Sequence, residues 1–262
     1  MKQQLLEIMP QRAYLMLKYW DYRVTHGARF KELQRERVNT TEDGYSYKPF
    51  DDKKAIFVHI PKCAGIAINE AIFGNRAGGH TTLEEYLNIF EPRCIRNYFK
   101  FTVVRNPWDR LVSAYFFLKN GGIGEKDRAG FVREFGDGLD FRSFVKSWVN
   151  RSNIWKWHHF RPQYHYMLDK REKVQLDFVA FLENIDNDFS YITDQIGFVR
   201  TLTKSNKSKH FSYVDYYDEE TMAIVAETYA EDIQMLGYNF DNSSLEAQLA
   251  SRNRGKVYSL RP

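Results

Sequence analysis

The sequence predicts an α/β protein: a single domain with a mostly parallel central sheet flanked by helices. Two observations predict this fold class. Short apolar runs alternate along the chain with segments that carry helix start and stop residues. The composition is that of an ordinary globular protein, since 43% of the 262 residues are hydrophobic and 27% are charged. A chain of this length forms one large domain or two small ones, and we expect one.

Three apolar runs are candidates for the strands. The first, Ala55 to Ile60, is almost continuously apolar and is followed by Pro61, as expected for a strand buried on both faces of a parallel sheet. Phe99 to Val104 has the same character, and Asp177 to Glu183 is the third candidate. Because helical patterns separate these runs, we expect strands that are joined by helical crossovers.

Helix boundaries follow the first two runs directly. A helix is predicted over about Gly65 to Phe73, and Gly74 ends it. After the second run, Asn106 is a good N-cap and Pro107 suits the first turn of a helix that continues to Lys119. Each strand is therefore followed by a short loop and a helix.

The two ends of the chain differ from its middle. We expect an N-terminal helical extension over residues 1–50, the body of the domain over residues 51–240 and a C-terminal tail over residues 241–262. A long helix with an acidic start is predicted over Asp218 to Leu236. The N-terminal helix either packs on the domain or makes peripheral contact with an anionic membrane surface, although acidic residues dilute its basic character.

Charge and cysteine content exclude several classes of protein. The formal net charge of +4 is too small for a dedicated nucleic-acid-binding protein, but it suits a site that receives anions. The two cysteines, Cys63 and Cys94, cannot form a disulfide framework, and no ligand spacing indicates a metal site. We therefore expect no metal. The sequence shows neither a membrane-spanning stretch nor a signal peptide, so we also expect a cytoplasmic protein.

The loop after the first strand has the composition of a phosphate-binding loop. Residues 61–67 are mostly small and lead directly into a helix, where main-chain N–H groups and the helix dipole favour an anion. Lys62 adds a positive charge. The loop lacks the Gly-x-x-x-x-Gly-Lys-Ser/Thr pattern of nucleotide triphosphatases, which weakens the hypothesis of a nucleotide-type kinase.

The second strand is followed by another candidate anion site. Arg105 stands at the strand end and supplies forked donors that suit a phosphate monoester, and Ser113 lies two turns into the next helix. Alternatively, Arg105 pairs with a carboxylate and Ser113 only packs. Together with the Lys62 loop, however, the two residues indicate a ligand with two separate phosphate groups.

Both segments resemble the sulfotransferases that use 3′-phosphoadenosine 5′-phosphosulfate (PAPS), especially the carbohydrate branch and its bacterial relatives. Residues 57–65 resemble the 5′-phosphosulfate loop of that family, and residues 101–115 resemble its 3′-phosphate element. The resemblance is strongest over residues 55–118 and weaker over 160–240. It implies a P-loop-kinase-like sulfotransferase fold, and transfer of a sulfuryl group from PAPS to a hydroxyl of a polysaccharide, oligosaccharide or glycolipid, leaving 3′-phosphoadenosine 5′-phosphate (PAP).

The resemblance also implies the cofactor-binding residues. Arg105 and Ser113 would hold the 3′-phosphate. Apart from the resemblance, three lysines at 204, 207 and 209 are candidates for a loop over that phosphate, with an ordinary solvated charged loop as the alternative. This chain departs from the family at Ile66 and Ala67, where members usually carry Thr and Ser. The 5′-phosphosulfate would be bound by the side chain of Lys62 and the main-chain amides of the residues that follow it, Cys63, Ala64, Gly65, Ile66 and Ala67.

Sulfuryl transfer needs a general base for the acceptor and positive charge on the departing phosphate, but no metal. Lys62 suits the second role. His80 matches the place in the chain where related glycan sulfotransferases carry the base, although it could instead cap the helix expected after Thr82. His59, inside an apolar strand, is more typical of a core histidine. Two alternatives to an active sulfotransferase remain, an inactive PAP- or glycan-binding protein and a nucleotide-type kinase.

Overall fold

The computed structural model describes residues 6, 8–40, 44–198 and 212–253. The chain divides into two compact units, which are described separately. Unit 1 comprises Met1–Ile60, Ala64–Val104 and His165–Thr203, and unit 2 comprises Pro61–Cys63, Arg105–Tyr164 and Lys204–Pro262. The domain boundaries expected near residues 50 and 240 stay a prediction.

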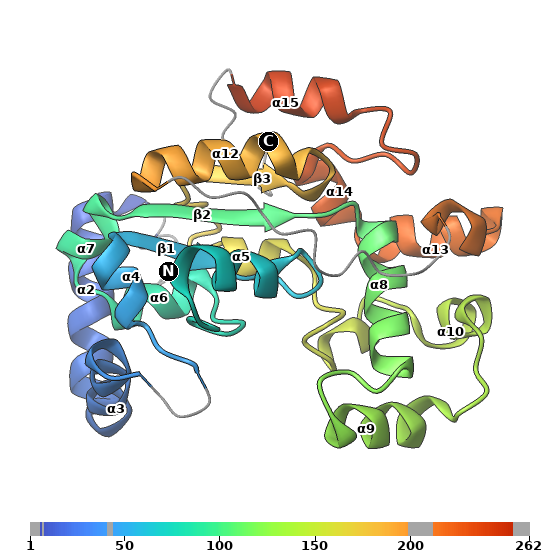
Figure 1. Cartoon of the computed structure of the whole chain (residues 1–262), viewed down its shortest axis with the longest axis horizontal. Coiled ribbons are helices and arrows are strands. Elements are labelled where there is room, and N and C mark those ends of the chain that lie inside the picture. Colours follow the sequence, from blue (N-terminus) through green and yellow to red (C-terminus); the bar gives the residue numbers. More distant parts are fainter. Residues whose placement is uncertain (1–5, 7, 41–43, 199–211, 254–262) are drawn as a thin grey trace. The chain divides into compact units, whose positions relative to one another are not determined.

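Unit 1 contains a three-stranded parallel sheet in the order β1-β2-β3 (Figure 1). The strands are β1 (Ala55–Val58), β2 (Phe99–Val104) and β3 (Phe178–Phe181). Phe57 lies opposite Phe101 in the β1–β2 ladder, and Val104 lies opposite Phe181 in the β2–β3 ladder. All four residues of β1 are buried, so the expectation of a parallel sheet with strands buried on both faces is confirmed.

The first strand ends at Val58 instead of Ile60, and the third strand is also shorter than predicted. It ends at Phe181, and the 3-10 helix η2 (Leu182–Asn184) takes the place of its expected last residues. The main-chain N–H of Phe181 donates to the carboxylate of Asp188 over 2.7 Å. Asp188 belongs to helix α12 (Ile185–Ile196), which contacts β2 and β3. A side chain from the next helix thus binds the main chain at the end of the strand.

The other helices of unit 1 precede or connect the strands. The predicted helix after the first strand is confirmed as α5 (Gly65–Phe73), which ends at Gly74 in the left-handed conformation. The remaining helices are α2 (Gln11–Thr25), α3 (Gly27–Val38), α4 (Lys48–Lys53), α6 (Leu83–Ile89) and α7 (Pro92–Asn97). Helix α4 contacts β1, and α2 contacts α3, α6 and α7. The short helix α11 (Tyr164–Met167) begins at the last residue of a unit 2 segment.

Unit 2 is helical and has an aromatic core. The predicted helix after the second strand is confirmed as α8 (Pro107–Lys119). Buried hydrophobic residues of α8, such as Trp108 and Leu111, pack in one cluster with aromatic side chains that include Phe131, Phe144 and Phe160. The other elements are α9 (Glu125–Phe135), α10 (Phe141–Trp148), η1 (Asn153–Trp155), η3 (Tyr213–Tyr216), α13 (Glu219–Thr228), α14 (Ala230–Leu236) and α15 (Leu245–Asn253).

The prediction of one long helix over Asp218 to Leu236 is wrong, because this segment is divided into α13 and α14. The division falls at Tyr229, whose φ of −110° and ψ of 27° interrupt the helical geometry. The Tyr229 side chain is buried, and its hydroxyl donates to the carbonyl of Phe160 over 2.7 Å. A tertiary contact therefore accompanies the break in a segment with a continuous helical pattern.

Among the residues that the structure describes, no helix combines the length and the apolar character that crossing a membrane requires.

Candidate anion-binding and base residues

The chain between β1 and α5 has an unusual backbone. Lys62 and Ala64 both adopt the left-handed conformation, with φ of 69° and 57°. Ala64 is the N-cap of α5 and has no side-chain acceptor to bind the amides of the first turn. These N–H groups are the orphan donors of a helix N-terminus, which are satisfied by water or by a ligand such as phosphate. The predicted phosphosulfate segment therefore contains the backbone features that an anion site needs.

Gly65 is required at the start of α5 for steric reasons. A Cβ atom at this position would lie 1.8 Å from Cδ2 of His59. The His59 side chain is 7% exposed, so its ring fills the space that a side chain at residue 65 would occupy. The interpretation of His59 as a buried histidine is thus correct, and its ring packs against the start of α5.

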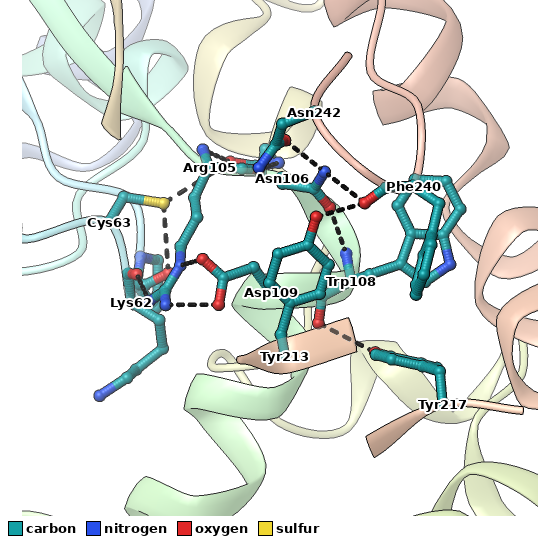
Figure 2. A network of polar contacts seen from close by, with 12 residues as sticks. Lys62, Cys63, Arg105, Asn106, Trp108, Asp109, Tyr213, Tyr217, Phe240 and Asn242 are labelled. Atoms are coloured by element: carbon teal, nitrogen blue, oxygen red, sulfur yellow. Dashed lines mark hydrogen bonds and ion pairs between the residues drawn. The ribbon is translucent and has the colours of Figure 1, made fainter. Parts of the chain in front are cut away.

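Lys62 lies close to a second cation. Its carbonyl accepts a hydrogen bond of 3.1 Å from Arg105 Nη1 (Figure 2). Its Nζ atom is 3.8 Å from the ring centroid of Phe117. Burial, followed by the charge of Arg105, lowers the pKa of Lys62 to about 8. An ammonium group in such surroundings would be stabilised by a bound anion.

Arg105 is paired with a carboxylate, as the alternative interpretation expected. Its Nε and Nη2 atoms donate to the two oxygens of Asp109 over 2.7 and 2.8 Å (Figure 2). Asp109 lies one turn before Ser113 on α8, so the two side chains share a face of that helix. A phosphate bound by Arg105 would therefore share the guanidinium with Asp109. Arg105 and Ser113 are 9% and 7% exposed.

Asn106 forms more hydrogen bonds than its predicted role as N-cap requires. The predicted cap is present, because Asn106 Oδ1 accepts from the N–H of Trp108 over 3.0 Å. The other side-chain atom, Nδ2, donates to Oδ1 of Asn242 over 2.7 Å (Figure 2). It also donates to the carbonyl of Asn239 over 2.9 Å. The residue after Arg105 is thus fully buried and bound to a segment more than a hundred residues later.

His80 is placed in unit 1 with His59. Its Nδ1 atom is 3.3 Å from the carbonyl oxygen of His59, and the two rings are 4.4 Å apart. A carbonyl only accepts hydrogen bonds, so Nδ1 carries the hydrogen in this contact and Nε2 of the neutral ring is the basic atom. The cap of α6 is Thr82, which forms a capping box with Glu85, so His80 does not have that structural role.

The predicted site residues are distributed over both units. Lys62, Cys63, Arg105 and Ser113 belong to unit 2, whereas His80 and residues 64–67 belong to unit 1. The three lysines at 204, 207 and 209 lie outside the described residues. Within the described ranges, no group of three or more His, Cys, Asp or Glu residues has the arrangement of a metal site.

Sequence reasoning missed the contacts of Gln163. It is fully buried and forms hydrogen bonds with both the N–H and the carbonyl of Arg105. Gln163 belongs to the segment whose resemblance to the family is weaker, and no local pattern predicts a partner 58 residues away. Two signals were available: the weaker resemblance, which includes Arg161 to Gln163, and a polar residue within the largely aromatic stretch of residues 155–166.

Comparison with known proteins gives an independent assignment. The model of the Sulfotransferase family matches residues 46–239. The chain is 25% identical over 177 residues to Carbohydrate sulfotransferase 14 of zebrafish (Danio rerio), a match that covers 58% of this chain and 47% of the relative. It is also 34% identical over 101 residues to an uncharacterized protein of Archaeoglobus fulgidus, covering 38% of this chain and 68% of that protein. The chain thus spans about half the length of the zebrafish relative. No solved structure matches.

Proposed function

The chain belongs to the sulfotransferase family, and on that premise we propose that it transfers a sulfuryl group from PAPS to a hydroxyl of a carbohydrate. The observation that carries the proposal is the hydrogen bond of 3.1 Å between Arg105 and the carbonyl of Lys62. It joins the two segments to which we assign the phosphates of PAPS. Their cations would balance the charges of a ligand with two separate phosphate groups.

The donors at these positions are of the kinds that bind phosphate groups. We assign the 5′-phosphosulfate to Lys62 and the main-chain amides of residues 63–67, and the 3′-phosphate to Arg105 and Ser113. The first turn of α5 supports the first assignment because its N-cap, Ala64, has no side-chain acceptor. Ile66 is 41% exposed, so the position where the family carries a hydroxyl presents an apolar side chain to solvent. This difference supports the second candidate, an inactive PAP-binding protein.

The residues have separate roles in the proposed reaction. PAPS supplies the sulfuryl group when it is bound. His80 Nε2 accepts the proton of the acceptor hydroxyl, since the contact of Nδ1 with the His59 carbonyl leaves Nε2 as the basic atom. Lys62, protonated below its pKa of about 8, stabilises the negative charge that develops on the departing phosphate. No step requires a metal ion.

The acceptor and the location are further parts of the proposal. A carbohydrate acceptor, as a polysaccharide, oligosaccharide or glycolipid, is supported by the name of the zebrafish relative. A cytoplasmic location is supported by Cys63 and Cys94, neither of which forms a disulfide. Peripheral membrane contact is assigned to α2, on which Leu17 and Trp20 are 50% and 46% exposed.

The decisive experiment is a transfer assay with sulfur-labelled PAPS and a panel of glycans in the presence of EDTA. Label in a glycan that depends on intact Lys62 supports the proposal, and Lys126→Ala, which changes an exposed lysine of α9, is the matched control. PAP binding without transfer to any acceptor would favour the inactive binding protein. A strict requirement for magnesium and ATP would favour a kinase.

A further inference from the structure

Gln163 pairs with the main chain of Arg105 through both ends of its side-chain amide. Its Oε1 atom accepts from the N–H of Arg105 over 2.9 Å, and its Nε2 atom donates to the Arg105 carbonyl over 2.8 Å. The opposite orientation of the amide would place donor against donor and acceptor against acceptor, so these contacts define which end is oxygen. Arg105 directly follows the last residue of β2, and Gln163 binds its two peptide groups as a neighbouring strand would.

Two buried charges hold the segment that carries Gln163. The carboxylate of Asp232 on α14 accepts from the main-chain N–H of Gln163 over 2.7 Å and from that of Tyr164 over 2.8 Å. Arg110 on α8 donates to the carbonyls of His159 and Arg161 over 3.2 and 2.6 Å. Because both charged side chains are buried, their hydrogen bonds are protected from water and fix the main chain on either side of Pro162.

Gln163 also contacts the segment that carries Lys62. The thiol of Cys63 lies 3.5 Å from Gln163 Oε1, and Cys63 is fully buried. One side chain therefore contacts the residue after Lys62 and the main chain of Arg105. The hydrogen bond from Arg105 Nη1 to the Lys62 carbonyl closes the connection between the two segments.

We propose that Gln163 is a positioning residue for the cofactor, which holds Arg105 against the Lys62 segment in the orientation that recognises the 3′-phosphate. The inference rests on the proposed function, in which Arg105 binds that phosphate. A residue with a merely structural role would support the stability of the protein without affecting its preference between nucleotides. The relevant readout is therefore the ratio of the Kd for 5′-AMP to the Kd for PAP, since the two ligands differ by the 3′-phosphate.

The test compares Gln163→Met with the wild type by calorimetric titration of PAP and 5′-AMP, well below the melting temperature. Methionine has a similar length but forms neither hydrogen bond with Arg105, so PAP affinity should fall about tenfold, the equivalent of about one hydrogen bond. The affinity for 5′-AMP should change less than about threefold, so that most of the preference is lost. Gln248→Met is the matched control, because Gln248 is also buried in unit 2 and its Nε2 donates to the Leu236 carbonyl over 2.8 Å. That variant should lose stability and keep the preference.

The outcomes separate this inference from the proposed function. A wild type without preference for PAP over 5′-AMP would overturn the proposed function and the role of Gln163 with it. A wild type with this preference and a Gln163→Met variant that keeps it would overturn the inference alone. If Gln163→Met does not fold, Gln163→Asn takes its place, because its shorter amide remains polar but cannot reach both groups of Arg105, and the same criterion applies.

Discussion

Replacing Arg105 with alanine should remove most of the preference of the protein for PAP over 5′-AMP. A hydrogen bond to a charged group contributes about 1.5–3 kcal/mol, which corresponds to ~10–150-fold in affinity. We expect a loss at the upper end of this range, because the substitution also leaves Asp109 without the partner that it contacts over 2.7 and 2.8 Å. The unpaired carboxylate would then repel the 3′-phosphate.

A double variant tests the second part of this reasoning. Removing Asp109 in the Arg105→Ala background should recover part of the lost PAP affinity, because the repulsive charge disappears with it. Isothermal titration with PAP and 5′-AMP measures both effects, and Arg128→Ala, an exposed arginine of α9, is the control. An Arg105→Ala protein whose preference for PAP stays within about threefold of the wild type would refute the assignment, since even one charged contact is worth more.

Three further predictions concern His80, Lys62 and Asp232. His80→Ala should lower turnover by about 10²–10⁴-fold while the thermal shift with PAP stays normal, and a variant that keeps a tenth of the activity would exclude His80 as the base. PAP affinity should fall as the pH rises through about 8, where Lys62 loses its charge, and a flat titration profile between pH 7 and about 9 would contradict that role. Burial raises the pKa of Asp232 to about 6, so the folded protein binds more protons than the unfolded chain between pH 3.8 and about 6. Urea unfolding should therefore show this residue's contribution to stability decreasing as the pH rises through that window, and Asp232→Asn should remove this dependence.

Local patterns predicted much of the fold. The strands Ala55–Val58 and Phe99–Val104 were predictable because a strand buried on both faces is apolar along its whole length. The start of α8 was equally visible, since Asn106 and Pro107 are adjacent in the sequence and act locally. The break between α13 and α14 was not predictable, because it coincides with a contact of Tyr229 to a carbonyl 69 residues away.

The candidate site shows the same division between local and distant information. The Lys62 and Arg105 segments are each continuous in sequence, so their composition alone indicated anion binding. The ion pair of Arg105 with Asp109 lies within one turn and was among the alternatives. Gln163 is 58 residues from Arg105 and 69 residues from Asp232 in the sequence, and no pattern in a single sequence indicates its contacts with them. The sequence alone therefore did not reveal the hydrogen-bond network that supports the candidate binding residues.

The close approach of Gly65 to His59 has a consequence for the evolution of this chain. The distance of 1.8 Å from a Cβ at residue 65 to the imidazole leaves no room for both a methyl group and this ring. The two positions should consequently covary among related sequences: an alanine or larger residue at 65 is expected only where a smaller side chain has replaced the histidine at 59. A lineage would have to change residue 59 first, because the opposite order passes through an intermediate with an overpacked core.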